Sequence, residues 1–206
     1  MTNNNMYFIA NWKMFGSVKS VNSLNKVISY SKTKKLKANI IYCPPYTLIK
    51  SFVDKTKKSN IKIGAQDCHT QINYGPFTGA ISSKMIKDLG GKFVIIGHSE
   101  TRAENDNKKI NLKIKSALNE KLNVILCIGE KLIDKRKNKT KYVLKKQLLE
   151  GLKNLKNLNK VIIAYEPVWS IGTGIIPSEN DLKKNIRFIR DTLKISKKFT
   201  KSKILY

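Results

Sequence analysis

The chain has 206 residues, of which 41% are hydrophobic, and 41 basic against 14 acidic residues give it a formal net charge of +27. This length allows one domain with a full core, and no stretch is apolar enough to span a bilayer, which excludes a membrane protein. Cys43, Cys68 and Cys127 are too widely spaced for a disulfide framework or a zinc site. We expect one cytoplasmic domain over residues 1–206, without a metal.

The high charge raises the question of a nucleic-acid partner. All but four of the 41 basic residues are lysine, and they cluster in polar stretches at residues 32–37, 55–58, 131–141 and 194–203. Nucleic-acid-binding proteins gather basic residues on one face and often place aromatic residues among them. Here the lysines are scattered, and an AT-rich genome explains the abundance of lysine, asparagine and isoleucine. We predict no specific nucleic-acid partner and only weak, salt-sensitive binding to polyanions.

In chain order, short apolar segments alternate with longer amphipathic ones. The apolar segments predict buried strands at residues 7–10, 40–43, 61–65, 93–96, 124–128 and 161–164. Helical spacing of apolar residues occurs over residues 18–30, 82–89, 110–118, 143–155 and 180–193. Thr47, Ser82 and Ser178 are candidate N-caps. This order predicts six βα units that form a parallel sheet covered by helices.

Two α/β architectures fit this order, an open doubly wound sheet and a closed barrel. Asn11 and Lys13 follow the first strand, His98 and Glu100 the fourth, and Glu166 the sixth. A barrel of parallel strands brings all carboxyl ends to one mouth, whereas an open sheet spreads them along an edge. No Gly-x-Gly-x-x-Gly motif follows the first strand, which disfavours a dinucleotide fold. We therefore predict a (β/α)8 barrel with these five residues at its mouth.

Residues 165–174, Tyr-Glu-Pro-Val-Trp-Ser-Ile-Gly-Thr-Gly, are the most informative part of the chain. Pro167 disfavours helical geometry at Glu166, so that the carboxylate leaves the sixth strand in an extended segment. Gly172 and Gly174 allow backbone N–H groups to approach a phosphate. The segment predicts a general base beside a closing lid.

Six further motifs precede this segment in one order. They are Asn-Trp-Lys at residues 11–13, Cys-Pro-Pro at 43–45, Gly-Ala-Gln-Asp at 64–67, Phe-Thr-Gly at 77–79, Gly-His-Ser-Glu at 97–100 and Cys-Ile-Gly-Glu at 127–130. Together they make the chain resemble the triose-phosphate isomerase family from one end to the other. The resemblance implies a TIM barrel and a cofactor-free isomerase of glycolysis and gluconeogenesis, which interconverts dihydroxyacetone phosphate and D-glyceraldehyde 3-phosphate.

The same resemblance implies roles for the catalytic residues. Glu166 would remove a proton from the carbon beside the substrate carbonyl, and His98 would stabilise the enediolate oxygen as a neutral donor. A helix starting at Ser99 would point its positive end at His98 and disfavour the charged ring. Lys13 would add a fixed positive charge.

Binding and supporting roles follow from the resemblance as well. Asn11 would orient the substrate, Gly172 would donate a backbone N–H to the phosphate, and Glu100 would pair with Lys13. Thr78, like Gln66, belongs to the third loop, which in this family reaches into the partner subunit's active site. We therefore expect a homodimer. His69 has no such neighbours in the sequence and is interpreted as a loop residue.

Several positions depart from the family pattern. Thr101 and Ala80 replace a usual arginine and a usual acidic residue, and the second lid hinge at residues 175–177 is short. Residues 204–206 resemble the beginning of a seventh strand, whereas an eight-fold barrel needs roughly 250 residues. We expect an incomplete barrel, from a fragment or a truncated protein, that is inactive without the phosphate-binding loops after strands seven and eight.

One alternative belongs to a different class of function. The chain could be a non-catalytic basic barrel remnant that binds polyanions. The presence of Asn11, Lys13, His98 and Glu166 together favours the isomerase, because drift would be expected to remove at least one of them.

Overall fold

The computed structural model describes residues 6–32, 38–156, 158–195 and 203–206, and these residues contain seven parallel strands. The strands are β1 (Met6–Asn11), β2 (Ala38–Cys43), β3 (Lys62–Ala65), β4 (Phe93–Ile96), β5 (Asn123–Ile128), β6 (Val161–Tyr165) and β7 (Lys203–Leu205). Each predicted strand lies within two residues of an observed one. The expected start of a seventh strand at residues 204–206 coincides with β7.

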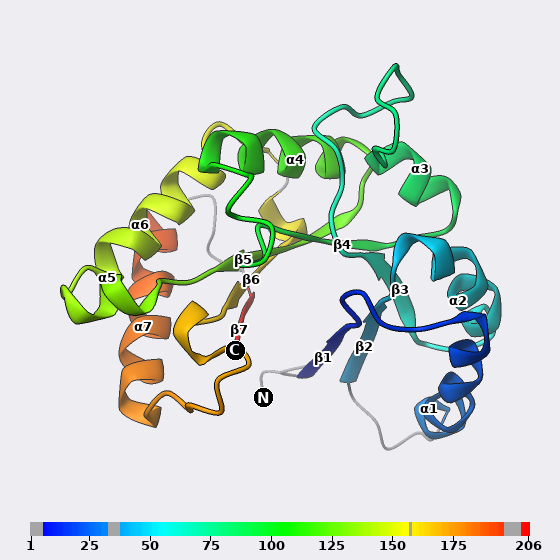
Figure 1. Cartoon of the computed structure of the whole chain (residues 1–206), viewed down its shortest axis with the longest axis horizontal. Helices are drawn as coiled ribbons and strands as arrows, with labels where there is room; N and C mark the ends of the chain where they lie inside the picture. Colours follow the sequence, from blue (N-terminus) through cyan, green and yellow to red (C-terminus); the bar gives the residue numbers. More distant parts are fainter. Residues whose placement is uncertain (1–5, 33–37, 157, 196–202) are drawn as a thin grey trace.

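Helices cover the outside of the sheet (Figure 1). They are α1 (Leu24–Ser31), α2 (Ile49–Thr56), α3 (Ser83–Asp88), α4 (Asn107–Asn119), α5 (Leu132–Arg136), α6 (Thr140–Gly151) and α7 (Glu179–Ile195). Short 3-10 helices occur at η1 (Val18–Ser23), η2 (Tyr46–Leu48), η3 (Leu158–Lys160) and η4 (Val168–Ser170). The predicted alternation of strands and helices is confirmed.

The order of the strands decides between the two predicted architectures. Each strand pairs in parallel with the next one along the chain, from β1 to β7. A doubly wound sheet would reverse its strand order at a switch point, so this order excludes it. At the remaining seam, the ammonium of Lys203 on β7 donates to the hydroxyl of Tyr7 on β1 and lies 4.4 Å from the centre of its ring. The sheet is a nearly closed barrel.

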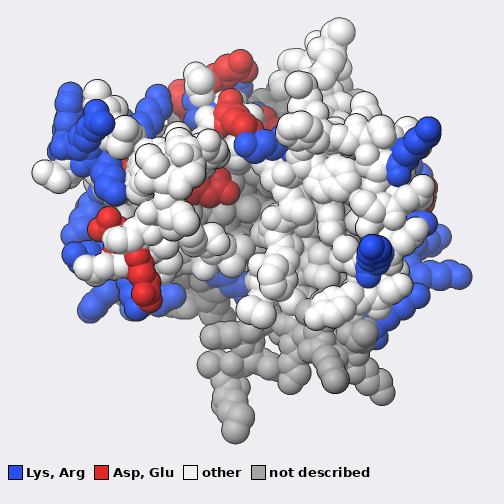
Figure 2. Space-filling view, turned by 60° about the horizontal axis from the view of Figure 1, so that its bottom comes forward, with Lys and Arg blue, Asp and Glu red and all other residues white. Residues whose placement is uncertain are grey.

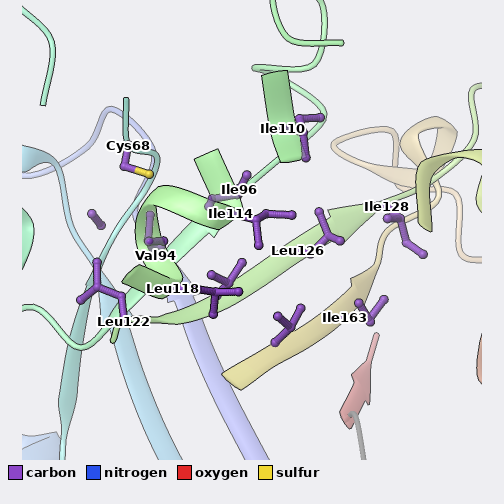
Figure 3. Close-up of a cluster of buried hydrophobic side chains, with 14 of the residues drawn as sticks. Cys68, Val94, Ile96, Ile110, Ile114, Leu118, Leu122, Leu126, Ile128 and Ile163 are labelled. Carbon is purple, nitrogen blue, oxygen red and sulfur yellow. The ribbon is translucent and has the colours of Figure 1, made fainter. Parts of the chain in front are cut away.

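Two apolar cores hold the barrel together. The inner one is formed by alternate residues of the strands, including Ile41, Phe93, Ile125 and Ile162. The outer one lies between the strands and the helices, where Ile110, Ile114 and Leu118 of α4 meet strand residues such as Leu126 (Figure 3). Because both faces of β4, β5 and β6 are buried, these strands are almost continuously apolar, as is typical of parallel sheets.

The structure corrects two predicted helices, and the one expected over residues 143–155 ends at Gly151 with a turn at residues 152–154. Residues 18–23 form a 3-10 helix and only residues 24–31 an α-helix, because serine hydroxyls there bond the local backbone, with the Ser20 hydroxyl accepting from Ser17 N–H. Thr47 lies inside η2 and caps nothing. Ser82 and Ser178 accept backbone N–H groups as predicted. The candidate cap Thr47 implied a helix near α2 but gave it no range, and the short helix α5 was not predicted from the sequence.

Candidate active site

The segments after β1, β4 and β6 meet at the carboxyl-terminal mouth of the barrel. Lys13 Nζ lies 2.8 Å from Oε1 of Glu100, and Nε2 of His98 lies 3.7 Å from Oε2 of Glu166. Asn11 joins this group through Lys13, whose backbone N–H donates to Asn11 Oδ1 at 3.0 Å. The five polar residues that the sequence places after three strands are therefore neighbours in space.

Polar contacts hold Lys13 in an unusual backbone conformation. Its φ of 50° lies in the left-handed region, which non-glycine residues rarely adopt. The Asn11 side chain accepts the Lys13 N–H, and Nε2 of Gln66 donates to the carbonyl oxygens of both Lys13 and Cys43, at 2.8 and 2.9 Å. These bonds fix the start of the Lys13 side chain, so that its ammonium points toward Glu100.

His98 is buried at the end of β4 and is oriented by the turn that follows it. Its carbonyl oxygen accepts the N–H groups of Thr101 and Arg102, and its Nδ1 accepts the backbone N–H of Glu100 at 3.3 Å. The prediction that a helix starts at Ser99 is wrong. Residues 99–104 form turns, and the next helix, α4, is capped by Asp106. A backbone N–H group therefore faces the imidazole, but it comes from a turn.

Glu100 lies between Lys13 and His98. Besides its bond to Lys13, its Oε2 lies 3.4 Å from Nδ1 of His98, and its side chain is 54% exposed. The hydrogen bond from Lys13 lowers the pKa of Glu100, whereas desolvation opposes this change. Glu100 therefore stays ionised and holds the ammonium of Lys13 near the imidazole.

The backbone of Glu166 is held by the loop that follows β5. Its N–H donates to the Ile128 carbonyl at 2.9 Å, and a Cβ at position 129 would lie only 1.9 Å from the Glu166 carbonyl oxygen. Only glycine fits at position 129 without displacing Glu166. The Gly129 backbone is in turn fixed by Gln147 of α6, whose side chain bonds its N–H and its carbonyl at 2.9 and 3.0 Å.

The Glu166 carboxylate is partly desolvated. Its side chain is 38% exposed, yet Oε2 is buried and has no hydrogen-bond partner among the described residues. Desolvation raises the pKa of Glu166 above its ordinary value, and the nearby His98 and Lys13 partly offset this rise. An incompletely solvated carboxylate is a stronger proton acceptor than one in water, as a general base requires.

Comparisons with known proteins identify the family of the chain. Residues 6–206 match the model of the family described as triosephosphate isomerase. The chain belongs to the triosephosphate isomerase family. It is 38% identical over 188 residues to the triosephosphate isomerase of Clostridium botulinum (strain ATCC 19397 / Type A), covering 89% of this chain and 75% of the relative. The corresponding enzyme of Dictyoglomus thermophilum is 42% identical over 186 residues, with coverages of 88% and 74%.

A solved structure extends the similarity to the fold. The crystal structure of triosephosphate isomerase from Bartonella henselae superposes with a TM-score of 0.87 at 31% sequence identity. The match covers 98% of this chain and 82% of the solved one. The barrel is thus that of the triosephosphate isomerase family.

The base of the predicted lid contains a buried carboxylate. Glu130 accepts hydrogen bonds from the indole of Trp169 at 2.8 Å and from the hydroxyl of Tyr165 at 3.2 Å. Lys135 of α5 lies 3.8 Å from the centre of the Trp169 ring. A cavity of about 400 Å³ lies beside these residues and reaches α7. The sequence motif Cys-Ile-Gly-Glu therefore does contact the lid segment, through Glu130.

The tip of the lid segment is open to solvent. Gly172 and Gly174 adopt left-handed φ values of 70° and 72°, and apart from the adjacent residues no heavy atom lies within 4 Å of where their Cβ atoms would be. Ile176 beside them is 84% exposed. Gly172 is thus exposed to solvent in this structure.

The loop between β3 and α3 extends away from the barrel (Figure 1). Thr78 lies there exposed, and the rings of His69 and Phe77 contact each other in a tilted arrangement with centres 4.7 Å apart. Gln66, by contrast, bonds Lys13 within the same chain. The sequence did not predict the supporting contacts of Gln66 and Gln147, because their spacing does not show that they bond backbone groups of other loops.

Basic side chains are distributed over the surface. Figure 2 shows lysine and arginine at both margins of one face, with mostly uncharged residues between them. In the described part of the chain, no helix is both long and apolar enough to cross a membrane. The same residues contain no group of three or more histidine, cysteine, aspartate or glutamate side chains that could hold a metal ion.

Proposed function

We propose that the mouth of this barrel catalyses the interconversion of dihydroxyacetone phosphate and D-glyceraldehyde 3-phosphate, with Glu166 as the base and His98 as the electrophile. The observation that carries the proposal is the close approach of Glu166 Oε2 to His98 Nε2. A substrate that lies over both atoms can lose a proton from carbon to one while its carbonyl oxygen receives a hydrogen bond from the other. Membership of the family supports the same reaction.

The reaction proceeds by moving one proton between neighbouring carbons. Glu166 takes the proton from the carbon beside the carbonyl, and the electron pair of the broken C–H bond forms the enediolate. The protonated Glu166 then returns the proton to the adjacent carbon, and the hydroxyl proton passes to the former carbonyl oxygen, which gives the isomeric carbonyl compound. Because a carboxylate is a modest base, the developing oxygen charge must be stabilised by donors already in place.

His98 supplies such a donor. A backbone N–H that donates to Nδ1 requires this nitrogen to be unprotonated, so the neutral ring carries its proton on Nε2. This nitrogen faces Glu166 and can donate to the substrate oxygen. Lys13 adds positive charge for the enediolate and the phosphate, and Asn11 keeps Lys13 in its left-handed conformation while orienting the substrate.

Lid movement completes the proposed site. The residues from Trp169 to Gly174 would close over the substrate, and Gly172 N–H would donate to its phosphate. Left-handed glycines and an exposed tip support this movement, because nothing in the described residues packs against Gly172. Closure would exclude water from the enediolate and prevent loss of its phosphate.

A homodimer would cover exposed apolar residues of the first and third loops. Met14 is 96% and Phe15 73% exposed next to Lys13, and Tyr74 and Phe77 lie exposed on the protruding loop. Exposed apolar clusters of this kind are typical of interaction sites. We propose that Thr78 lies against the partner subunit's Asn11 and Lys13, that the chain is one domain and that it acts in the cytoplasm.

The described strands give six βα units and β7, and the chain spans about three quarters of the length of the curated relatives it matches, 75% for the Clostridium enzyme.

The central experiment shortens the base by one methylene group. Glu166→Asp in an active protein should lower kcat on the order of a hundredfold with little change in KM, because a displacement of about 1 Å misplaces the base. Glu120→Asp, at the distant end of α4, is the matched control and should leave kcat unchanged. An unchanged kcat in Glu166→Asp removes Glu166 from the role.

A further inference from the structure

Two buried polar atoms beside the site lack hydrogen-bond partners among the described residues. They are Nε of Arg102 and Oε2 of Glu166. Both residues line the same cavity, of about 10 Å³, together with residues of the β4 and β5 loops. Buried polar atoms are nearly always hydrogen-bonded, either to protein or to an enclosed water, so two such atoms at one cavity require an explanation.

Arg102 brings a positive charge to this cavity. Its Nη2 donates to the Cys127 carbonyl at 2.8 Å and its Nη1 to Oδ1 of Asn107 at 3.0 Å. A Cβ at position 97 would come within 3.2 Å of Nη2, so Gly97 makes room for the guanidinium. Burial lowers the pKa of Arg102 to about 10, which leaves it charged at neutral pH. Both acceptors are neutral, and the charge is not cancelled by them.

We propose that Arg102 is a positioning residue for Glu166 and acts through one water molecule enclosed between Arg102 Nε and Glu166 Oε2. A cavity of this volume is about what a single water requires. The water would accept from Nε–H and donate to Oε2, and hydrogen bonds to charged groups are stronger than neutral ones. The bridge would orient the carboxylate and favour its ionised form. This inference rests on the proposed role of Glu166 as the base.

Other charged or titratable groups also act on Glu166. Lys13 approaches from the β1 loop, His98 and Glu100 from the β4 loop, and the thiol of Cys127 from β5. Their contributions remain in place when Arg102 alone is changed. A change in the pH dependence of activity in an Arg102 variant therefore reports the contribution of the guanidinium and its water.

The test measures pH profiles of kcat/KM for isomerisation. Arg102→Met removes the charge and the Nε–H donor. The acid limb of the profile, where kcat/KM falls as Glu166 is protonated, should therefore move to higher pH by roughly one pH unit, and kcat should fall. Arg102→Lys keeps the charge without the Nε–H and should shift the limb less. Asn105→Ala is the structural control, because the buried Asn105 side chain donates to Thr101 O at 2.6 Å in the same turn. It should lower the Tm and leave the acid limb in place.

Several outcomes overturn the inference. An unshifted limb in Arg102→Met, or an equal shift in Asn105→Ala, shows that Arg102 has only a structural role. If Arg102→Met does not fold, a high-resolution crystal structure of the unchanged protein decides, because a water must lie within about 3.2 Å of both atoms. If the unchanged protein lacks isomerase activity, the proposed function fails. A carbon-13 NMR titration of Glu166, with and without Arg102→Lys, still tests the bridge.

Discussion

The two sides of the candidate site are built differently. On one side, β4, β5 and β6 are buried almost throughout and carry His98 and Glu166 at or just beyond their ends. On the other side, no residue of β1 is fully buried, and Lys13 is held by polar contacts to Asn11, Gln66 and Glu100. The base and the electrophile therefore stand at the ends of packed strands, whereas the fixed positive charge is positioned by hydrogen bonds and an ion pair alone.

The difference has a physical reason. Packed apolar strands resist displacement, because core side chains interdigitate at nearly crystalline density. A general base tolerates little displacement, so it benefits most from such support. A lysine ammonium acts as a point charge over a longer range, and an error in its position costs less. The expected effects of substitutions should follow this order.

The largest effect on the packed side is expected from Gly129→Ala. The added methyl group would lie 1.9 Å from the Glu166 carbonyl oxygen, and this backbone atom cannot yield without moving the base. We expect a fall in kcat of roughly a hundredfold or more, measured by steady-state kinetics. Gly151→Ala, at the end of helix α6, is the control, since its methyl group would meet the side chain of Ile110 at an ordinary 3.8 Å. Equal activity of the two variants would contradict the close approach at Gly129.

Two glutamines allow a direct comparison of the sides, because each bonds backbone groups of a site loop. Gln147→Ala leaves the N–H and carbonyl of the buried Gly129 unpaired, which should cost about 1–3 kcal/mol of unfolding free energy and lower kcat. Gln66→Ala frees the carbonyl of the half-buried Lys13, where water can replace the lost bond, whereas the carbonyl of the buried Cys43 keeps the backbone N–H of Trp12 as a donor. It should lower stability less and raise KM more than it lowers kcat. Denaturant unfolding and kinetics check both, and the reverse pattern would refute the distinction.

A smaller effect is expected from pH and from Glu100. Desolvation raises the pKa of Glu166, so activity should be lost, as pH falls, at a higher pH than an ordinary glutamate would give. Glu100 adds to this rise by repulsion, so Glu100→Gln should move the acid limb of kcat/KM to lower pH. A limb that moves to higher pH would mean that the loss of the Lys13 partner dominates.

Glu100 also makes a contribution to stability of the opposite sign. Its pKa is lowered in the folded state, so the stabilisation is present above the unfolded-state pKa and is lost as pH falls through the folded-state value. At 54% exposure this contribution is small. Thermal unfolding of Glu100→Gln at neutral and acidic pH should therefore differ from that of the unchanged protein only slightly, and only at the higher pH.

Much of this architecture could be predicted from the sequence, and the reasons for the failures are local or tertiary. Continuous apolar strands and polar residues at their ends predicted the barrel and brought Asn11, Lys13, His98, Glu100 and Glu166 to one mouth. The turn at residues 99–104 was mistaken for a helix because sequence spacing does not show that Asp106 supplies the cap. The contacts of Gln66, Gln147 and Arg102 join segments from different βα units, and periodicity carries no information about them.

The smallest expected effect concerns the net charge, which does not distinguish the two sides. Exposed lysines occur both on α1 and α2 and on or beside α5 and α6. If the lysines reflect composition alone, duplex DNA should bind weakly and without sequence preference, and binding should fall steeply between about 50 and 200 mM salt. Replacing Lys26 and Lys55, or instead Lys137 and Lys145, by glutamine removes the same charge from either side and should weaken binding equally in fluorescence anisotropy. Tight, sequence-selective binding at physiological salt, lost in only one of the two pairs, would instead identify a nucleic-acid surface and require a second function beside isomerisation.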